Sequence, residues 1–371
     1  MKITEIRTFL VGRCLLVRVY TDAGIIGNGE AGLWAHQRPV ETFIRDFADY
    51  FVGQDPLRIE HHHQVISRQY HFTGAAISAA LSAIDIALWD ILGKSVDLPV
   101  YQLLGGKCRD KVRVYASVGG NSLDAVADSA KGAVDAGFTA VRLYPFFPDF
   151  EKATSAKLIS DAVKMTAVTR ETIGDDIDIG IEIHRNLTPS VAISLATAIE
   201  PFRLMYYEDP LVPESEEALE YLAAHIDIPM ALGERSHDIF QFVELINRQV
   251  ASFIRVDLSL AGGFTQVKKI AAIAESALVE VFPHLVGSPV SGAAFAHLAA
   301  AIPNYALMES NPPSEMGSAI VDAPFIEKDG YREVPDRPGI GVEIDEEACS
   351  RFPYTPVPIA GFFHADGSVA H

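Results

Sequence analysis

Three short apolar segments between residues 178 and 235 each end in a carboxylate. They are DIGIEIH (178–184), LMYYEDP (204–210) and PMALGER (229–235). Their glutamates, Glu182, Glu208 and Glu234, follow one another at equal intervals of 26 residues. A strand, a turn, a helix and a return loop take about that many residues in a parallel α/β unit. We therefore expect three successive parallel strands that each present one glutamate at the same edge.

The same alternation of strands and helices runs through the chain from residue 112 onward. Eight candidate strands are separated by amphipathic stretches of helical length. The strands are VRVYASV, AVRLYPF, DIGIEIH, LMYYEDP, PMALGE, SFIRVDL, LVEVFPH and YALMES. This order predicts an α/β fold of the (β/α)₈ TIM-barrel type, with a doubly wound open sheet as the alternative. The strand count and the polar residues at so many strand ends favour the barrel.

The regions on either side of the barrel have a different pattern. Residues 1–111 read as strands followed by helices, one of them long and apolar, which predicts an α+β domain. Within it the Gly-rich stretch 25–39 looks like a mobile loop, with a plain connection as the alternative. We expect the barrel to cover residues 112–310. Residues 311–371 are rich in Pro and Gly but carry several aromatic residues, so we expect them to pack back on the N-terminal domain as irregular structure.

Composition limits the class of protein. The chain of 371 residues has a net charge of −19, which argues against nucleic-acid binding because phosphate contacts need basic clusters. Its three cysteines form no CxxC pair, which fits a reducing cytoplasm. The N-terminal residues do not resemble a signal peptide, and we find no run of about 18 apolar residues that would span a membrane.

The predicted strand ends carry the residues with chemical potential. In strand order they are Arg142 and Tyr144, Glu182 and His184, Glu208, Glu234, Asp257, His284, and Glu309. Helix capping would explain any one of these acids, but not a run of strands that each end in an acid or a histidine. Barrel enzymes react at this end of their strands. Three glutamates without a soft ligand favour Mg²⁺, with Mn²⁺ as a substitute, over zinc.

The two histidines suggest a pair of proton-transfer groups. His184 is expected at the barrel mouth beside Glu182, and His284 lies across the barrel with Asp257 to orient it. A base and an acid on opposite sides of a divalent cation could remove a proton next to a carboxylate and expel a hydroxyl from the next carbon, a β-elimination. Glu309 could donate a hydrogen bond to the developing enediolate if it is protonated. Tyr144 is either a further acid or base or a packing aromatic.

Several motifs resemble the enolase superfamily in its mandelate-racemase-like branch. SAIDIALWDILGK and LPVYQLLGG are similar to the end of that branch's capping domain, and IEIHR, EDP, LGER, DLSLAGGFTQ and PHLVGSP to its barrel strand ends. PGIGVEID and HADGSVAH resemble the closing segment of sugar-acid dehydratases, especially the galactonate dehydratase type. The resemblance covers nearly the whole chain.

The resemblance implies a role for each candidate residue. Glu182, Glu208 and Glu234 would bind one Mg²⁺; His284, oriented by Asp257, would abstract the proton on carbon 2; His184 would protonate the leaving 3-hydroxyl; and Glu309 would assist the enediolate. The N-terminal domain would cap the barrel, and its loop with Trp34 and His36 would help to choose the substrate. The substrate would be an aldonate such as galactonate, gluconate or mannonate, and the enzyme a cytoplasmic homo-oligomer.

The chain also departs from the pattern of the branch. Racemases carry a Lys-x-Lys pair on the second strand, where this chain has Arg142-Leu143-Tyr144, so that we expect Arg142 to bind substrate and no lysine base to act there. The first metal ligand is usually Asp and is Glu182 here. An epimerase or cycloisomerase that uses the same enediolate, or a non-catalytic sugar-acid-binding protein, are the alternatives to a dehydratase.

Overall fold

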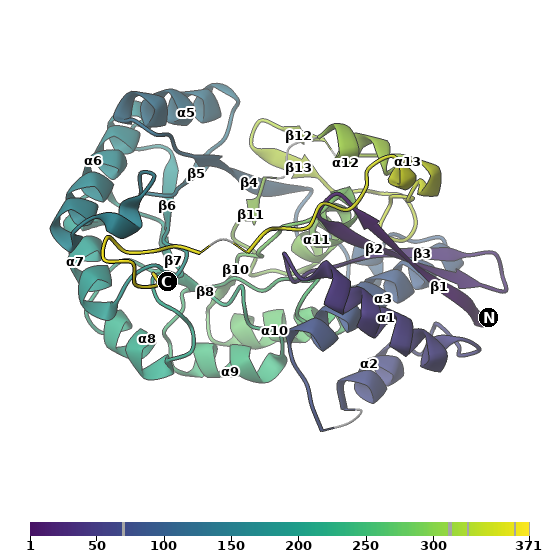
Figure 1. The fold of residues 1–371 in the computed structure, drawn as a ribbon. Coiled ribbons are helices and arrows are strands. Elements are labelled where there is room, and N and C mark those ends of the chain that lie inside the picture. The colour runs from purple at the N-terminus through teal and green to yellow at the C-terminus, as the bar shows by residue number, and fades with distance from the viewer. Residues whose placement is uncertain (69–70, 311–313, 325, 360, 371) are drawn as a thin grey trace.

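The computed structural model describes residues 1–68, 71–310, 314–324, 326–359 and 361–370. The chain forms a barrel of parallel strands ringed by helices, with an antiparallel sheet and three helices beside it (Figure 1).

Within these described residues, eight parallel strands form the barrel. They are β4 (Lys111–Val118), β5 (Ala140–Leu143), β6 (Asp178–Glu182), β7 (Tyr206–Glu208), β8 (Met230–Leu232), β9 (Phe253–Ile254), β10 (Glu280–Val281) and β11 (Met308–Glu309). Each of the first six pairs with the next in parallel, and β11 pairs with β4. A parallel bridge between Val281 and Tyr305 joins β10 to the segment that enters β11. The eight predicted strands and the predicted barrel are confirmed.

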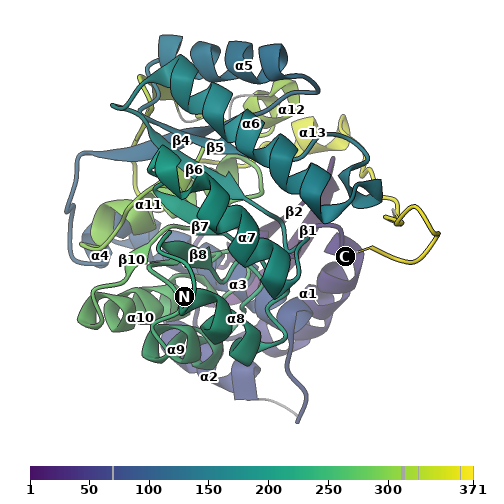
Figure 2. The same ribbon diagram turned by 90° about the vertical axis from the view of Figure 1, so that its left-hand side faces the viewer.

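The helices cover the outside of the barrel (Figures 1 and 2). They are α5 (Leu123–Asp135), α6 (Ser155–Ile173), α7 (Pro189–Ile199), α8 (Glu216–Ala223), α9 (Ile239–Asn247), α10 (Gly263–Ser276) and α11 (Pro289–Ala301), with short helices α4 (Val100–Leu103), η1 (Phe150–Lys152) and η2 (Glu200–Phe202). Helix α5 illustrates their sequence logic. Ser122 caps its first turn by accepting a hydrogen bond from the amide of Ala125, and Val126, Ala130 and Ala133 form its buried face.

The N-terminal domain is a three-stranded antiparallel sheet with helices on one face. Its strands are β1 (Ile3–Val11), β2 (Cys14–Thr21) and β3 (Ile26–Ala31), and its helices are α1 (Gln37–Phe51), α2 (Ile59–Arg68) and α3 (Ala75–Ser95). The interpretation of residues 25–39 as a mobile loop was wrong for 26–31, which form the largely buried β3. The glycines of β3 give no strand signal in the sequence. They are present because the strand packs closely on α3: a Cβ on Gly29 would lie 2.0 Å from the carbonyl oxygen of Ala83.

Helix α3 lies between the N-terminal sheet and α10. Ser82 accepts a hydrogen bond from the amide of Gly262 at 2.7 Å, and the indole of Trp89 donates to Thr265 at 3.0 Å. α3 has no unbroken run of about 18 apolar residues, because Asp85 and Asp90 interrupt it, but by length and composition alone it is apolar enough to cross a membrane. Its most apolar window is 67% buried inside the protein, which is the position of a core helix.

The C-terminal segment returns to the N-terminal domain. It contains α12 (Glu315–Ala319), β12 (Glu327–Lys328), β13 (Tyr331–Glu333) and α13 (Glu346–Ser350), and β13 pairs with the start of β4. The amide of Ile340 donates to Asp90 of α3 at 2.8 Å, and Asn28 of β3 donates to the carbonyl of Val342 at 3.2 Å. The predicted division at residues 111 and 310 stays a prediction.

Candidate active site

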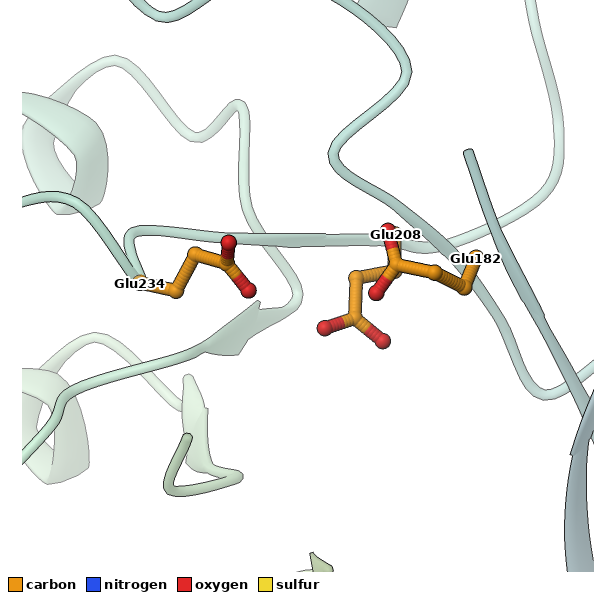
Figure 3. A group of neighbouring side chains, drawn as sticks. All are labelled: Glu182, Glu208 and Glu234. Carbon is orange, nitrogen blue, oxygen red and sulfur yellow. The ribbon is translucent and has the colours of Figure 1, made fainter. Parts of the chain in front are cut away.

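Three glutamates meet at the carboxyl ends of neighbouring strands. Glu182 ends β6, Glu208 ends β7, and Glu234 follows β8 by two residues. Glu182 and Glu208 are register partners in the parallel ladder, so that their side chains leave the sheet side by side. One oxygen from each of the three carboxylates lies within 4.8 Å of the others, and Figure 3 shows the groups facing one shared space.

This cluster fits a hard divalent cation. All its donors are carboxylate oxygens, and Glu182 and Glu208 are buried. Burial, together with Glu208 and Glu234, raises the pKa of Glu182 well above its usual value. A cation bound among the three groups would offset the repulsion that this shift reflects.

Three arginines form ion pairs with the glutamates: Arg142, Arg185 and Arg255. Arg142 Nη1 lies 3.4 Å from Glu182, 3.7 Å from Glu208 and 3.5 Å from Glu309. The predicted substrate-binding guanidinium is therefore already paired with acids of the site.

Arg255 is fully buried and was missed by the sequence reasoning. Its Nε lies 2.6 Å from Glu208 Oε1, its Nη2 pairs with Glu309, and its Nη1 donates to the carbonyls of Phe282 and Pro283. A signal was present, because SFIRVDL places an arginine two residues before Asp257 in an otherwise apolar strand. Arg255 thus links a metal-ligand candidate to the segment that enters His284.

His284 and Asp257 are joined by a hydrogen bond. His284 Nδ1 lies 2.8 Å from Asp257 Oδ2, and its Nε2 lies 3.8 Å from Glu234 Oε2. Although burial opposes the change, Glu234 and Asp257 raise the pKa of His284 to about 9. Burial also opposes the shift of Glu234, whose pKa His284, Arg185 and Arg255 lower to about 2. The imidazole nitrogen that is free of Asp257 faces the carboxylate cluster.

His184 lies at the other side of the cluster, in the turn after β6. Its Nε2 is 3.9 Å from Glu182 Oε2, and its backbone amide donates to Glu182 Oε1 at 2.7 Å. Burial lowers the pKa of His184 to about 4. The ring of Tyr144 lies 5.6 Å from it, and Asn186 donates a hydrogen bond to the Tyr144 hydroxyl at 3.3 Å.

Glu309, at the end of β11, is the last of the acidic residues at the site. Although burial opposes the change, Arg142 and Arg255 lower its pKa. In this arrangement Glu309 is a carboxylate, so it is not the protonated donor that the sequence interpretation allowed.

Trp34 and His36 lie in the loop after β3. The base of this loop is tied to the site face, because the amide of Gly32 donates to the carbonyl of Ser259 at 2.8 Å. The Trp34 side chain is 51% exposed. Across the described part of the chain, no hydrogen bond or ring contact joins Trp34 or His36 to the carboxylate cluster.

Two family models match the chain. The N-terminal domain model of the mandelate racemase / muconate lactonizing enzyme family matches residues 4–105, and the "Enolase C-terminal domain-like" model matches residues 125–348. The chain belongs to the enolase superfamily. It lies in the mandelate racemase / muconate lactonizing enzyme branch, as the motifs indicated.

Relatives within the enolase superfamily extend over the full length of the chain. D-galactonate dehydratase of Ralstonia pickettii is 35% identical, with 100% of both chains covered, and that of Pectobacterium atrosepticum is 35% identical over 94% of this chain and 93% of the relative. Among solved structures, a putative galactarate dehydratase from Agrobacterium radiobacter with bound Na and L-malate has a TM-score of 0.93, 30% identity and full coverage of both chains. A putative dehydratase from Salmonella enterica has a TM-score of 0.90 and 34% identity, covering 95% of this chain and 98% of that chain. The chain is an enzyme of the hydro-lyase class.

Proposed function

We propose that this protein is a Mg²⁺-dependent dehydratase of a sugar acid, an aldonate such as galactonate, gluconate or mannonate. The observation that carries the proposal is the placement of two histidines at opposite sides of three converging carboxylates. His184 approaches Glu182 from β6, and His284 approaches Glu234 from β10. The names of the full-length relatives support a dehydratase of this substrate class.

His284 is the proposed base. Asp257 holds the Nδ1–H side of the ring. Mg²⁺ among the three glutamates would offset the charge of Glu234 that raises the pKa of His284, so that the lone pair of Nε2 would be free to take the proton on carbon 2 of the substrate. Glu182, Glu208 and Glu234 would hold Mg²⁺, and a bound ion would stabilise the negative charge that develops on the substrate carboxylate.

His184 is the proposed acid. The negative charge of a bound sugar acid would oppose the burial that lowers the pKa of His184 and would favour the protonated ring. A proton from that ring joins the 3-hydroxyl as the carbon–oxygen bond breaks, so that water leaves and an enol remains. The enol becomes a 2-keto-3-deoxy acid by tautomerisation. Burial raises the pKa of the Tyr144 hydroxyl beside His184, which keeps that group protonated and able to donate to the substrate. We also propose that the enzyme acts in the cytoplasm as a homo-oligomer.

The test is a screen of aldonic and aldaric acids with Mg²⁺ that detects 2-keto-3-deoxy products, with an EDTA-treated sample as the control. We expect conversion of at least one acid with Mg²⁺ and none with EDTA. His284→Asn should lose turnover by at least roughly 100-fold while its urea unfolding curve stays close to that of the wild type. A metal-independent product, or full activity in His284→Asn, would contradict the proposal.

Hydrogen exchange separates dehydration from isomerisation. If the enzyme is an epimerase or a cycloisomerase, a substrate incubated in D₂O will take up deuterium at carbon 2 without loss of water. A dehydratase will release water from the same intermediate.

A further inference from the structure

The turn that carries His184 has an unusual backbone for its residue types. His184 has a φ of 54° and Arg185 a φ of 66°, and the amide of Asn186 donates to the carbonyl of Ile183 at 3.4 Å. Two central residues with positive φ and this hydrogen bond match a type I′ turn. Such turns favour Asn-Gly or Gly-Gly, because a side chain at positive φ is sterically unfavourable.

Contacts of Arg185 stabilise this otherwise unfavourable conformation. Arg185 Nη1 lies 2.8 Å from Asp209 Oδ2 and also pairs with Glu234, while the Arg185 backbone amide donates to the carbonyl of Asp209 at 2.7 Å. The bonds join the end of β6 to the ends of β7 and β8. Strained backbone persists where surrounding contacts over-determine it, and here one residue supplies three such contacts.

The turn also decides where the proposed acid points. At the start of the turn the amide of His184 donates to Glu182 Oε1, and the imidazole lies near both Glu182 and Tyr144. A return of residues 184 and 185 to negative φ would rotate the His184 side chain away from this position.

We infer that Arg185 is a positioning residue that holds the His184 turn in its left-handed conformation and thereby aims the acid at the leaving hydroxyl. The inference rests on the proposed dehydration, and it assigns to Arg185 a role in the elimination step over and above its support of Glu234.

Two substitutions separate these roles. Arg185→Gln removes the ion pairs and keeps a side chain at positive φ, so that the turn loses its support. Arg185→Gly removes the same ion pairs but places the residue best suited to this φ at the second central position of the turn. Both variants lose the contact with Glu234 equally, and only the first should displace His184.

The readout is the ratio of deuterium exchange at carbon 2 to loss of water, measured in D₂O on the acid that the wild type converts. Exchange depends on the base His284, whereas elimination also needs the acid. In Arg185→Gln the ratio should rise by roughly 10- to 100-fold, because the intermediate is reprotonated more often than it eliminates. In Arg185→Gly it should stay within about threefold of the wild-type ratio. Equal ratios in the two variants, or an unchanged ratio in Arg185→Gln, would overturn the inference.

A matched control and a structural readout complete the test. Arg203 also has a positive φ, of 54°, and pairs with Asp175 on the surface, so that Arg203→Gln should leave the ratio unchanged.

Crystal structures of the metal-free variants should show residues 184 and 185 leaving positive φ in Arg185→Gln but not in Arg185→Gly. This measurement holds even if the wild type converts no sugar acid, and left-handed residues in both variants would refute the inference. If Arg185→Gln does not fold, Arg185→Lys, which can reach only one of the two carboxylates at a time, replaces it in both measurements.

Discussion

At the scale of single residues, the site depends on buried charges that neutralise one another. Arg255 is the most enclosed of the three arginines and holds Glu208 and Glu309 together. Removal of one partner from a buried ion pair leaves an uncompensated charge and costs about 3 to 5 kcal/mol. We expect Arg255→Met to lower the free energy of unfolding by about that amount, measured by urea denaturation in EDTA. Arg248→Met, which breaks only surface ion pairs, is the control and should change it much less. A loss in Arg255→Met no larger than in the control would contradict this account.

A buried histidine makes stability depend on pH. His297 of α11 is fully buried, its Nδ1 accepts a hydrogen bond from the amide of Tyr101, and burial lowers its pKa to about 4. The unfolded chain, with a histidine pKa of about 6.5, binds a proton more readily than the folded chain between pH 6.5 and 4. Stability is therefore complete above this window and is lost as the pH falls through it.

We expect this histidine to remove about 2 kcal/mol of unfolding free energy between pH 7 and pH 5. His297→Gln keeps an acceptor for the Tyr101 amide but does not titrate, so its loss over the same range should be smaller by that amount. Urea curves at the two pH values measure the difference, and parallel losses in both proteins would rule out the assignment.

At the scale of elements, the contact between β3 and α3 sets how closely the N-terminal sheet and its central helix can pack. A methyl group on Gly29 would collide with the backbone of Ala83, which no side-chain movement can relieve. We expect Gly29→Ala to lower the free energy of unfolding by about 3 kcal/mol, measured by urea denaturation.

The control is a glycine without such a neighbour. Gly132 lies exposed within α5, and a methyl group added to it would meet no other atom within 4 Å. Because alanine favours the helix, Gly132→Ala should raise stability by about 1 kcal/mol. If both substitutions shift the midpoint of the urea unfolding curve in the same direction, the close contact between β3 and α3 does not limit packing.

The same elements show how far the sequence could predict the structure. The barrel strands and the three glutamates were predictable, because strand alternation and a regular spacing are local properties of the chain. Strand β3 was not predictable, because Gly27 and Gly29 are required by close packing against α3, which lies more than fifty residues further along the chain. The burial of Arg255 and the left-handed turn at His184 depend on partners from other strands, which no local pattern contains. The hairpin of β12 and β13 is too short to give a strand signal.

At the scale of the whole molecule, the N-terminal domain is completed by distant residues. Asp90 is fully buried and accepts hydrogen bonds from Asn28, Lys94 and the amide of Ile340, while Arg18 pairs with Glu343. A fragment of residues 1–110 lacks the partners beyond residue 338. We expect this fragment to show no cooperative unfolding transition by circular dichroism, and co-expression with residues 111–371 to restore one. A cooperative transition in the isolated fragment would show that the domain is complete without them.

The pairing of Asp90 with Ile340 also has a consequence for how the protein is made. A ribosome releases the N-terminal strands and α3 first, with the Asn28 and Lys94 donors to Asp90, and the third donor, the amide of Ile340, emerges some 250 residues later. At the usual rate of about 5 to 20 residues per second, the nascent domain waits on the order of ten seconds or more without the contacts that Ile340 and Val342 make to Asp90 and Asn28. The N-terminal domain therefore gains its last stabilising contacts only when the end of the chain has been made. A truncated message yields a chain in which the part made first lacks these contacts.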